Sequence, residues 1–166
     1  MREDDSKGAT GEWVAILGFS QGAKMTASLL LRQQARKDRL GRILAGSNFK
    51  FGVLLAGRGP LVSLDPDLTL AAYLIDASQI GSENLPNQHL LRTKEHILRL
   101  PTIHIHGMQD KGLELHRRLL EDYCEKESTK VVEWNGDHRI PIKEEDVSAV
   151  VRGILALAKE TGILTN

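Results

Sequence analysis

The sequence predicts an α/β fold in which a mostly parallel sheet is covered by helices on both faces. Two observations support this prediction. Four short apolar runs alternate with segments whose apolar residues recur at helical spacing. The runs end at glycine or asparagine, as strands that enter loops commonly do. At 166 residues the chain is long enough for one domain with a real core. We expect a loose segment over residues 1–12 and a single domain over residues 13–166.

The first half of the domain begins with a strand over residues 13–19, an apolar run typical of buried parallel strands. A helix follows from residue 24 to about residue 36, and residues 32–39 are expected to form its solvated, cationic end. The second strand covers residues 49–56. Residues 61–92 contain only short apolar runs, and we expect a short helix and loops there.

The second half repeats the alternation. A third strand covers residues 100–107, with a proline near its start and a glycine at its end. A helix over residues 112–127 and a fourth strand over residues 130–134 follow. The last helix comes after Pro141, and its expected apolar side consists of Val147, Val150, Val151, Ile154, Leu155 and Ala158.

The first strand ends in the sequence Gly18-Phe19-Ser20-Gln21-Gly22 and passes directly into the helix. This Gly-x-Ser-x-Gly pattern between a strand and a helix is typical of a nucleophile elbow, a sharp turn that exposes a serine hydroxyl. The turn strains the serine backbone, and the two glycines are expected to let strand and helix cross closely. The Gln21 N–H, at the helix N-terminus, is expected to bind an oxyanion. The alternative is a serine in an ordinary glycine-rich turn.

A serine nucleophile needs a base within hydrogen-bond reach, and a carboxylate that orients the base. Asp110 lies just after the third strand and His138 just after the fourth. Carboxyl ends of parallel strands meet at one edge of the sheet, so we expect both residues near Ser20. The order serine, aspartate, histidine is the one that hydrolases with this elbow use. Asp137 is a competing acid, but an immediate neighbour of the histidine is badly placed to orient its ring. The alternatives are a turn-forming aspartate and a loop histidine.

The remaining titratable residues give weaker signals. His104 and His106 alternate on one face of a strand, a spacing that could hold a metal ion, but no cysteine or carboxylate cluster accompanies them. His89, His96 and His116 have no partner that the sequence identifies. We therefore predict no metal ion and no cofactor. Cys124 is the single cysteine; an internal disulfide is excluded, and we expect a small buried hydrophobic side chain there.

Composition narrows the classes of partner. Acidic and basic residues number 22 each and aromatic residues make up 4% of the chain, so neither a nucleic acid nor an anionic membrane surface is expected to bind. No apolar run approaches the roughly 20 residues that span a bilayer. The polar N-terminus is unlike a secretory signal, and one cysteine fits a reducing compartment, which together predict a cytoplasmic protein.

Four blocks of sequence resemble the serine hydrolase FSH family of α/β-hydrolases, which is widespread in fungi. They cover residues 18–25, 49–57, 100–110 and 133–141. The resemblance implies an α/β-hydrolase fold with Ser20, Asp110 and His138 as the catalytic triad. It also implies cleavage of an ester or thioester of a small molecule or a carrier-bound acyl chain. Similar proteins in fungal polyketide clusters release acyl chains from the carrier protein of a polyketide synthase.

The sequence departs from the family pattern before the elbow. Such families place several strands, and a His-Gly loop with a second oxyanion donor, ahead of the serine. Those elements need roughly 75 residues, whereas Ser20 is the twentieth residue. We therefore expect that the N-terminal strands are missing and that the sheet has an exposed edge, through which a homo-oligomer could form. An alternative function is an impaired hydrolase fragment that acts as an interaction module or half of a complemented enzyme. Acyl transfer to an acceptor other than water is a third reading.

Overall fold

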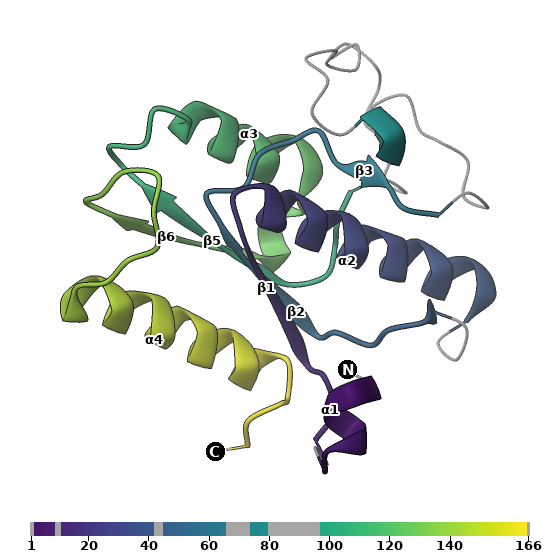
Figure 1. The fold of residues 1–166 in the computed structure, drawn as a ribbon. Helices are drawn as coiled ribbons and strands as arrows, with labels where there is room; N and C mark the ends of the chain where they lie inside the picture. The colour runs from purple at the N-terminus through teal and green to yellow at the C-terminus, as the bar shows by residue number, and fades with distance from the viewer. Residues whose placement is uncertain (1, 9–10, 42–44, 66–73, 80–96, 166) are drawn as a thin grey trace.

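The computed structural model describes residues 2–8, 11–41, 45–65, 74–79 and 97–165 (Figure 1). Its main sheet has four parallel strands in the order β1-β2-β5-β6. These strands are β1 (Ala15–Phe19), β2 (Phe51–Leu55), β5 (Thr102–Gly107) and β6 (Thr129–Trp134). Two short strands, β3 (Val62–Ser63) and β4 (Ile75–Asp76), pair separately. The described helices are α1 (Arg2–Ser6), α2 (Gln21–Leu40), α3 (Leu113–Tyr123) and α4 (Glu144–Glu160), with 3₁₀ turns over Ala77–Gln79 and Lys126–Ser128.

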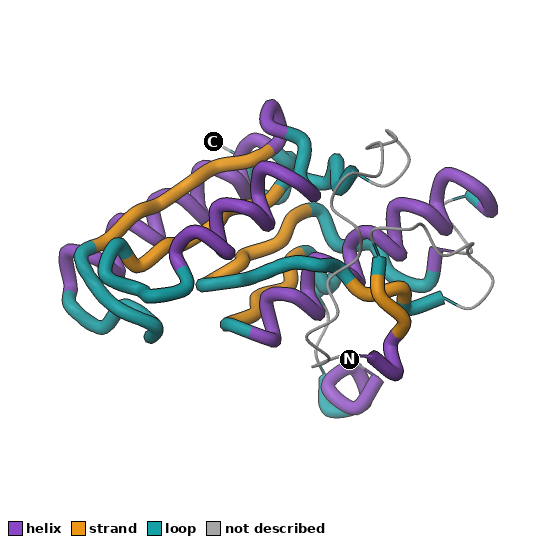
Figure 2. The backbone as a smooth tube through the Cα atoms, turned by 90° about the horizontal axis from the view of Figure 1, so that it is seen from above, coloured by secondary structure: helices purple, strands orange, loops and turns teal. Residues whose placement is uncertain are grey.

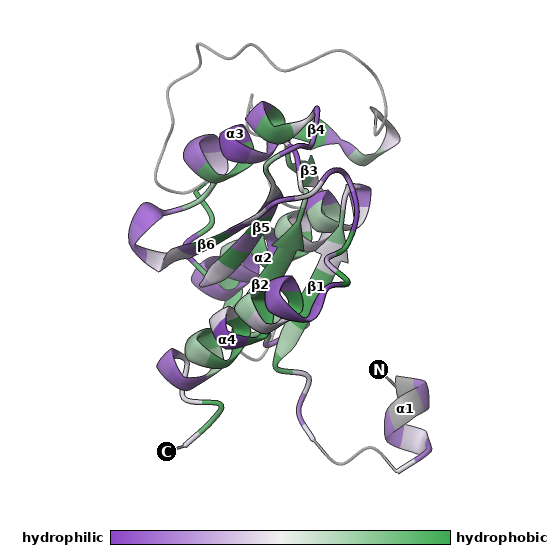
Figure 3. Cartoon of the chain, turned by 90° about the vertical axis from the view of Figure 1, so that its left-hand side faces the viewer, coloured by the Kyte–Doolittle hydropathy of each residue, from purple (hydrophilic) through white to green (hydrophobic). Residues whose placement is uncertain are grey.

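Helices cover both faces of the sheet, as the sequence predicts. Helices α2 and α3 lie on one face and α4 on the other (Figures 1 and 2). Alternate residues of β2 point to opposite faces, so Leu54 packs under α2 whereas Val53 and Leu55 pack toward α4. The strands β1 and β2 are mainly hydrophobic in colour (Figure 3). The fold is therefore an α/β arrangement with two hydrophobic cores, one on each side of the sheet.

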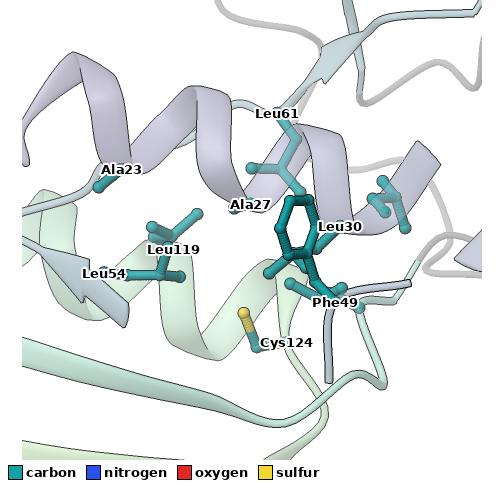
Figure 4. Packing of buried hydrophobic residues seen from close by; sticks show 10 residues of the cluster. Ala23, Ala27, Leu30, Phe49, Leu54, Leu61, Leu119 and Cys124 are labelled. Carbon is teal, nitrogen blue, oxygen red and sulfur yellow. The ribbon is translucent and has the colours of Figure 1, made fainter. Parts of the chain in front are cut away.

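Cys124 belongs to the core between the sheet and helices α2 and α3, as predicted. It is 3% exposed, and it packs in the same cluster as Leu30, Phe49 and Leu119 (Figure 4). No helix within the described residues is long and apolar enough to cross a membrane.

The end of α2 corrects one prediction. The helix runs to Leu40, and its polar residues Gln33 and Gln34 are only 4% and 5% exposed. The Gln33 amide donates to the Phe49 carbonyl and accepts from the Phe49 N–H, at 2.9 and 2.8 Å. Gln34 likewise donates to the Ile97 carbonyl and accepts from the Arg99 N–H. These side chains form hydrogen bonds with backbone groups of the segments that lead into β2 and β5. This part of the helix is therefore buried and is not a solvated tail.

The prediction of which residues of α4 face the core is correct for three of the six residues and wrong for the other three. Val150 and Ile154 pack against the core with the buried Leu157 and Ala158. Val147, Val151 and Leu155 are 37%, 45% and 46% exposed. The sequence gives two adjacent apolar stripes on this helix, and only one of them can face the sheet.

Two segments were only loosely assigned from the sequence. Residues 2–6, expected to be loose, form the short helix α1, which stands apart from the sheet (Figure 3). The segment 61–92 contributes β3, β4 and one 3₁₀ turn, and its other residues lie outside the described ones.

The register of the sheet determines where the loops meet. Phe19 pairs with Leu55, Leu55 with Ile105, and Gly107 with Trp134, so the strands end at one edge. The loops that follow β1, β5 and β6 leave from that edge, and they contain Ser20, Asp110 and His138.

Candidate active site

Ser20 occupies the turn between β1 and α2 with a strained backbone. Its φ is 55° and its ψ is −115°, a conformation that residues with a side chain rarely adopt. The turn is held from both sides, because the Ser20 N–H donates to the Leu55 carbonyl at 2.8 Å and the Ser20 carbonyl accepts from the Ala23 N–H. The observed geometry is the sharp strand-to-helix turn predicted from the Gly-x-Ser-x-Gly pattern.

The two glycines of the pattern have different functions. A Cβ atom on Gly18 would overlap the backbone of Gly22 and Ala23, so glycine is required where β1 passes the first turn of α2. A Cβ atom on Gly22 would contact nothing within 4 Å among the described residues. The prediction that both glycines make room for the crossing is therefore right for Gly18 and wrong for Gly22.

Backbone hydrogen bonds connect the loop after β5 to the end of β6 and the loop that follows it. The Met108 N–H donates to the Trp134 carbonyl and the Gln109 N–H to the Gly136 carbonyl, at 2.9 and 2.8 Å. A Cβ atom on Gly107 would meet the carbonyl oxygens of Gly136 and Asp137, so only glycine allows this close approach. The contacts fix the loop that bears Asp110 relative to the loop that bears His138.

The structure brings together the three side chains singled out from the sequence. His138 Nε2 lies 2.9 Å from Ser20 Oγ, and His138 Nδ1 lies 2.7 Å from Asp110 Oδ2. The Phe19 ring lies beside the imidazole, with ring centroids 5.1 Å apart. Asp137, the competing acid, is exposed and forms an ion pair with Arg139 at 2.8 Å. Among the described residues, His138 therefore pairs with Asp110, whereas Asp137 pairs with Arg139.

Asp110 is a buried carboxylate that is held in its charged form. Burial by itself raises its pKa. The Gly112 N–H, which donates to Oδ1 at 2.7 Å, and the hydrogen bond to His138 outweigh that effect, so the pKa of Asp110 lies below its ordinary value. An ionised Asp110 favours the tautomer with hydrogen on His138 Nδ1 and leaves Nε2 free to accept a proton from Ser20.

Gln21 is the first residue of α2. N–H groups in the first turn of a helix have no partner within the helix, and the helix dipole makes this end favourable for negative charge. Its position, directly after Ser20, is the one that the sequence analysis assigned to an oxyanion donor.

A column of buried histidines extends from the site into the core. The rings of His104, His106, His116 and His138 follow one another with centroids 5.9 Å apart at each step. His104, His106 and His116 are at most 2% exposed. Burial lowers the pKa of His104 to about 3 and that of His106 to about 4, and it lowers the pKa of His116 although the charge of Asp110 opposes this. All three are therefore neutral near pH 7.

His116 is the residue that sequence reasoning missed. Its Nε2 lies 3.7 Å from Asp110 Oδ2. The signal in the sequence was its position: it falls on the apolar face of a predicted helix, six residues after Asp110. Among the described residues, the group that could hold a metal ion is Asp110, His116 and His138 rather than the spaced pair His104 and His106.

Comparisons with known proteins agree with this fold. The family described as serine hydrolase (FSH1) matches residues 5–150. Esterase claE of Penicillium crustosum is 55% identical over 98% of this chain, and esterase citA of Monascus ruber is 56% identical over 97%. The chain spans 62% and 60% of the lengths of these two relatives. A solved structure from work on two fungal esterases of Rhizomucor miehei matches 97% of this chain and 56% of its own, with a TM-score of 0.57 and 13% identity. That likeness supports the α/β-hydrolase fold alone.

The strain at Ser20 predicts an unusual pair of stability changes. Ser20→Gly and Ser20→Ala both remove the hydroxyl and its hydrogen bond to His138. Glycine tolerates the positive φ, whereas alanine keeps the strain, so the glycine variant should be more stable than the alanine variant by about 1 kcal/mol. Urea unfolding of both variants measures the difference. Equal stabilities would mean that the turn is not strained in solution.

The buried histidines predict a loss of stability on mild acidification. The unfolded chain binds protons on His104 and His106 near pH 6.5, whereas the folded chain does so only near the lowered pKa values. The free energy of unfolding should therefore fall as the pH falls from about 6.5 to about 4. Urea unfolding across this range checks the slope, and the His104→Gln variant should have a shallower one. Identical slopes would contradict the neutral state of His104.

Proposed function

Because the chain belongs to the serine hydrolase (FSH1) family, we propose that it cleaves carboxylic esters or thioesters through an acyl-enzyme on Ser20. The observation that carries the proposal is the hydrogen bonding of His138. One ring nitrogen lies 2.9 Å from a serine oxygen and the other lies 2.7 Å from a buried, ionised carboxylate. A base so placed can activate a hydroxyl that is otherwise a weak nucleophile.

In the proposed reaction, Ser20 Oγ attacks the carbonyl carbon while His138 Nε2 takes the hydroxyl proton. Asp110 keeps the imidazole in position and stabilises its positive charge. The Gln21 N–H donates to the oxyanion of the tetrahedral intermediate. The protonated His138 then gives its proton to the leaving alcohol or thiol. Water next attacks the acyl-enzyme while His138 takes its proton, and His138 returns that proton to Ser20 Oγ as the carboxylic acid is released.

For the substrate we propose an acyl ester or thioester, either small or attached to a carrier protein. The resemblance to proteins of fungal polyketide clusters supports release of an acyl chain from a polyketide synthase as the finer form of this proposal. Acyl transfer would use the same three residues with an alcohol or amine in place of water. Product analysis with added alcohols or amines distinguishes transfer from hydrolysis.

Covalent labelling tests the nucleophile directly. A fluorophosphonate should label wild-type protein on Ser20, because an activated serine attacks phosphorus as it attacks a carbonyl, and the Ser20→Ala variant should not be labelled. The Asp110→Asn variant should hydrolyse an aryl ester about 10⁴-fold more slowly than wild type, since the imidazole loses its tautomer.

Asp137→Asn is the matched control for Asp110→Asn. It removes a carboxylate from the neighbour of His138, but that carboxylate is exposed and pairs with Arg139. We expect its turnover to stay within a few-fold of wild type. No labelling of folded wild-type protein would contradict the proposal, as would equal losses in the two aspartate variants.

The edge of the sheet favours a second candidate function. β1 is the outermost strand of the described sheet, and Leu17 in its centre is 58% exposed. We propose as the alternative that hydrolysis depends on a second polypeptide or a second copy of this chain pairing with β1. If the partner is a second copy, specific activity should rise with protein concentration in parallel with the mass measured by light scattering; if it is another polypeptide, the chain alone should show no hydrolysis. A monomer that hydrolyses esters with a robust, concentration-independent specific activity would exclude this alternative.

A further inference from the structure

Asp110, His116 and His138 each direct one potential metal ligand to the same point. The three atoms, one from each side chain, all lie within 4.8 Å of one another. His138 Nδ1 is 2.7 Å and His116 Nε2 is 3.7 Å from Asp110 Oδ2. The residues come from the loop after β5, from α3 and from the loop after β6, so folding rather than local sequence assembles the group.

These separations are close to those of a tetrahedral zinc site. Zinc binds imidazole nitrogen and carboxylate oxygen at about 2.0–2.2 Å, which places neighbouring ligand atoms about 3.3–3.6 Å apart. The observed distances from Asp110 Oδ2, 2.7 Å to His138 Nδ1 and 3.7 Å to His116 Nε2, lie on either side of this range. A small rotation of the His138 side chain would increase the shorter distance to the value that zinc requires. Two imidazoles and one carboxylate are ligands that zinc uses, whereas magnesium prefers oxygen ligands alone.

Two of the three ligands are buried and held in place. Asp110 and His116 are 7% and 2% exposed. The Gly112 N–H holds Asp110 Oδ1 at 2.7 Å, which leaves Oδ2 as the oxygen that faces both imidazoles. A Cβ atom on Gly112 would lie 3.1 Å from His116 Nε2 and 3.3 Å from Asp110 Oδ1, so glycine leaves space where these groups converge.

The third ligand provides access from solvent. The His138 side chain is 48% exposed, so an ion can reach the group from its side. His116 Nε2 lies beyond hydrogen-bond distance of Asp110 Oδ2, and its Nδ1 has no hydrogen-bond partner among the described residues. An ion bound to Nε2 would give this nitrogen a partner on the side that faces Asp110, while Nδ1 would keep its hydrogen.

We propose that Asp110, His116 and His138 bind a divalent transition-metal ion, with Zn²⁺ as the best fit, and that the ion inhibits hydrolysis reversibly. The inhibitory part rests on the proposed function, whereas the binding part does not. The ion is a regulator of the site and takes no part in the reaction.

Inhibition follows from the tautomer of His138. A metal ion on Nδ1 uses the lone pair of that nitrogen, so the hydrogen that Nδ1 donates to Asp110 leaves to solvent and Nε2 takes one from solvent. The ring then carries its hydrogen on Nε2 and cannot accept the Ser20 proton. No net proton is gained or lost on this ring, and removal of the ion restores the original tautomer.

Calorimetry tests binding without hydrolysis. Zn²⁺ is titrated into the Ser20→Ala variant, which keeps all three ligands, and one ion should bind per chain while Mg²⁺ should not bind. The added change His116→Asn should weaken Zn²⁺ binding at least about 10- to 100-fold, because the loss of a ligand costs no less than the loss of a group that orients one. The matched control Asp137→Asn removes an exposed carboxylate that pairs with Arg139 and does not belong to the group, and it should bind Zn²⁺ as before.

Two measurements on the wild-type chain complete the test. Zn²⁺ should prevent fluorophosphonate labelling of Ser20, and a chelator should restore it. Zn²⁺ should also shift the imidazole NMR signals of His116 and His138, a result that does not depend on any variant folding.

Three results would overturn the proposal: no binding of Zn²⁺, binding that His116→Asn leaves unchanged, or binding that leaves Ser20 labelling unchanged. If the wild-type chain is not labelled even without metal, the proposed function fails. Calorimetry and the NMR signals then still decide whether the metal site exists.

Discussion

The close crossing of β1 and α2 is the constraint on which the site depends. Gly18 has no side chain where the backbone of Gly22 passes, so the chain can turn from strand to helix at Ser20. The turn forces a positive φ on that serine, and its cost is offset by hydrogen bonds and by the packing of Ala23 and Ala27 against the sheet. As a result the hydroxyl stands at the sheet edge, where the loops after β5 and β6 also end. Without this crossing His138 would have no serine within reach.

Contacts between the loops after β5 and β6 hold Asp110 and His138 in position relative to each other. Gly107 allows the loop after β6 to lie against the end of β5, and backbone hydrogen bonds lock the two loops together. Asp110 is buried, and the imidazole of His116 beside it is neutral near pH 7. A carboxylate in such surroundings would interact strongly with the imidazolium that the proposed reaction forms. The same burial leaves His116 facing Asp110 without a hydrogen bond between them, at the point where we propose that a metal ion binds.

The sequence predicted much of this arrangement because its signals are local. The alternation of apolar runs and helical spacing predicted four parallel strands, and the family resemblance agreed with the match to residues 5–150. The proximity of Ser20, Asp110 and His138 followed from the rule that parallel strands end at one edge.

The errors in the predictions from sequence concern contacts between segments that are distant along the chain. Gln33 and Gln34 appear polar and solvated in sequence, yet they hydrogen-bond to backbone groups at residues 49, 97 and 99. The place of His116 on the apolar face of a predicted helix indicates that it is buried, but its position beside Asp110 depends on how α3 packs, which the local pattern does not report.

In the proposed reaction, Ser20, activated by His138, forms a covalent bond with the acyl group of the substrate. Mass spectrometry of protein quenched in acid during turnover of a slowly hydrolysed aryl ester tests this claim most directly. We expect one acyl group per chain, on the peptide that contains Ser20, and its disappearance once the ester is consumed. Turnover with an unmodified Ser20, or an acyl group on another residue, would contradict it.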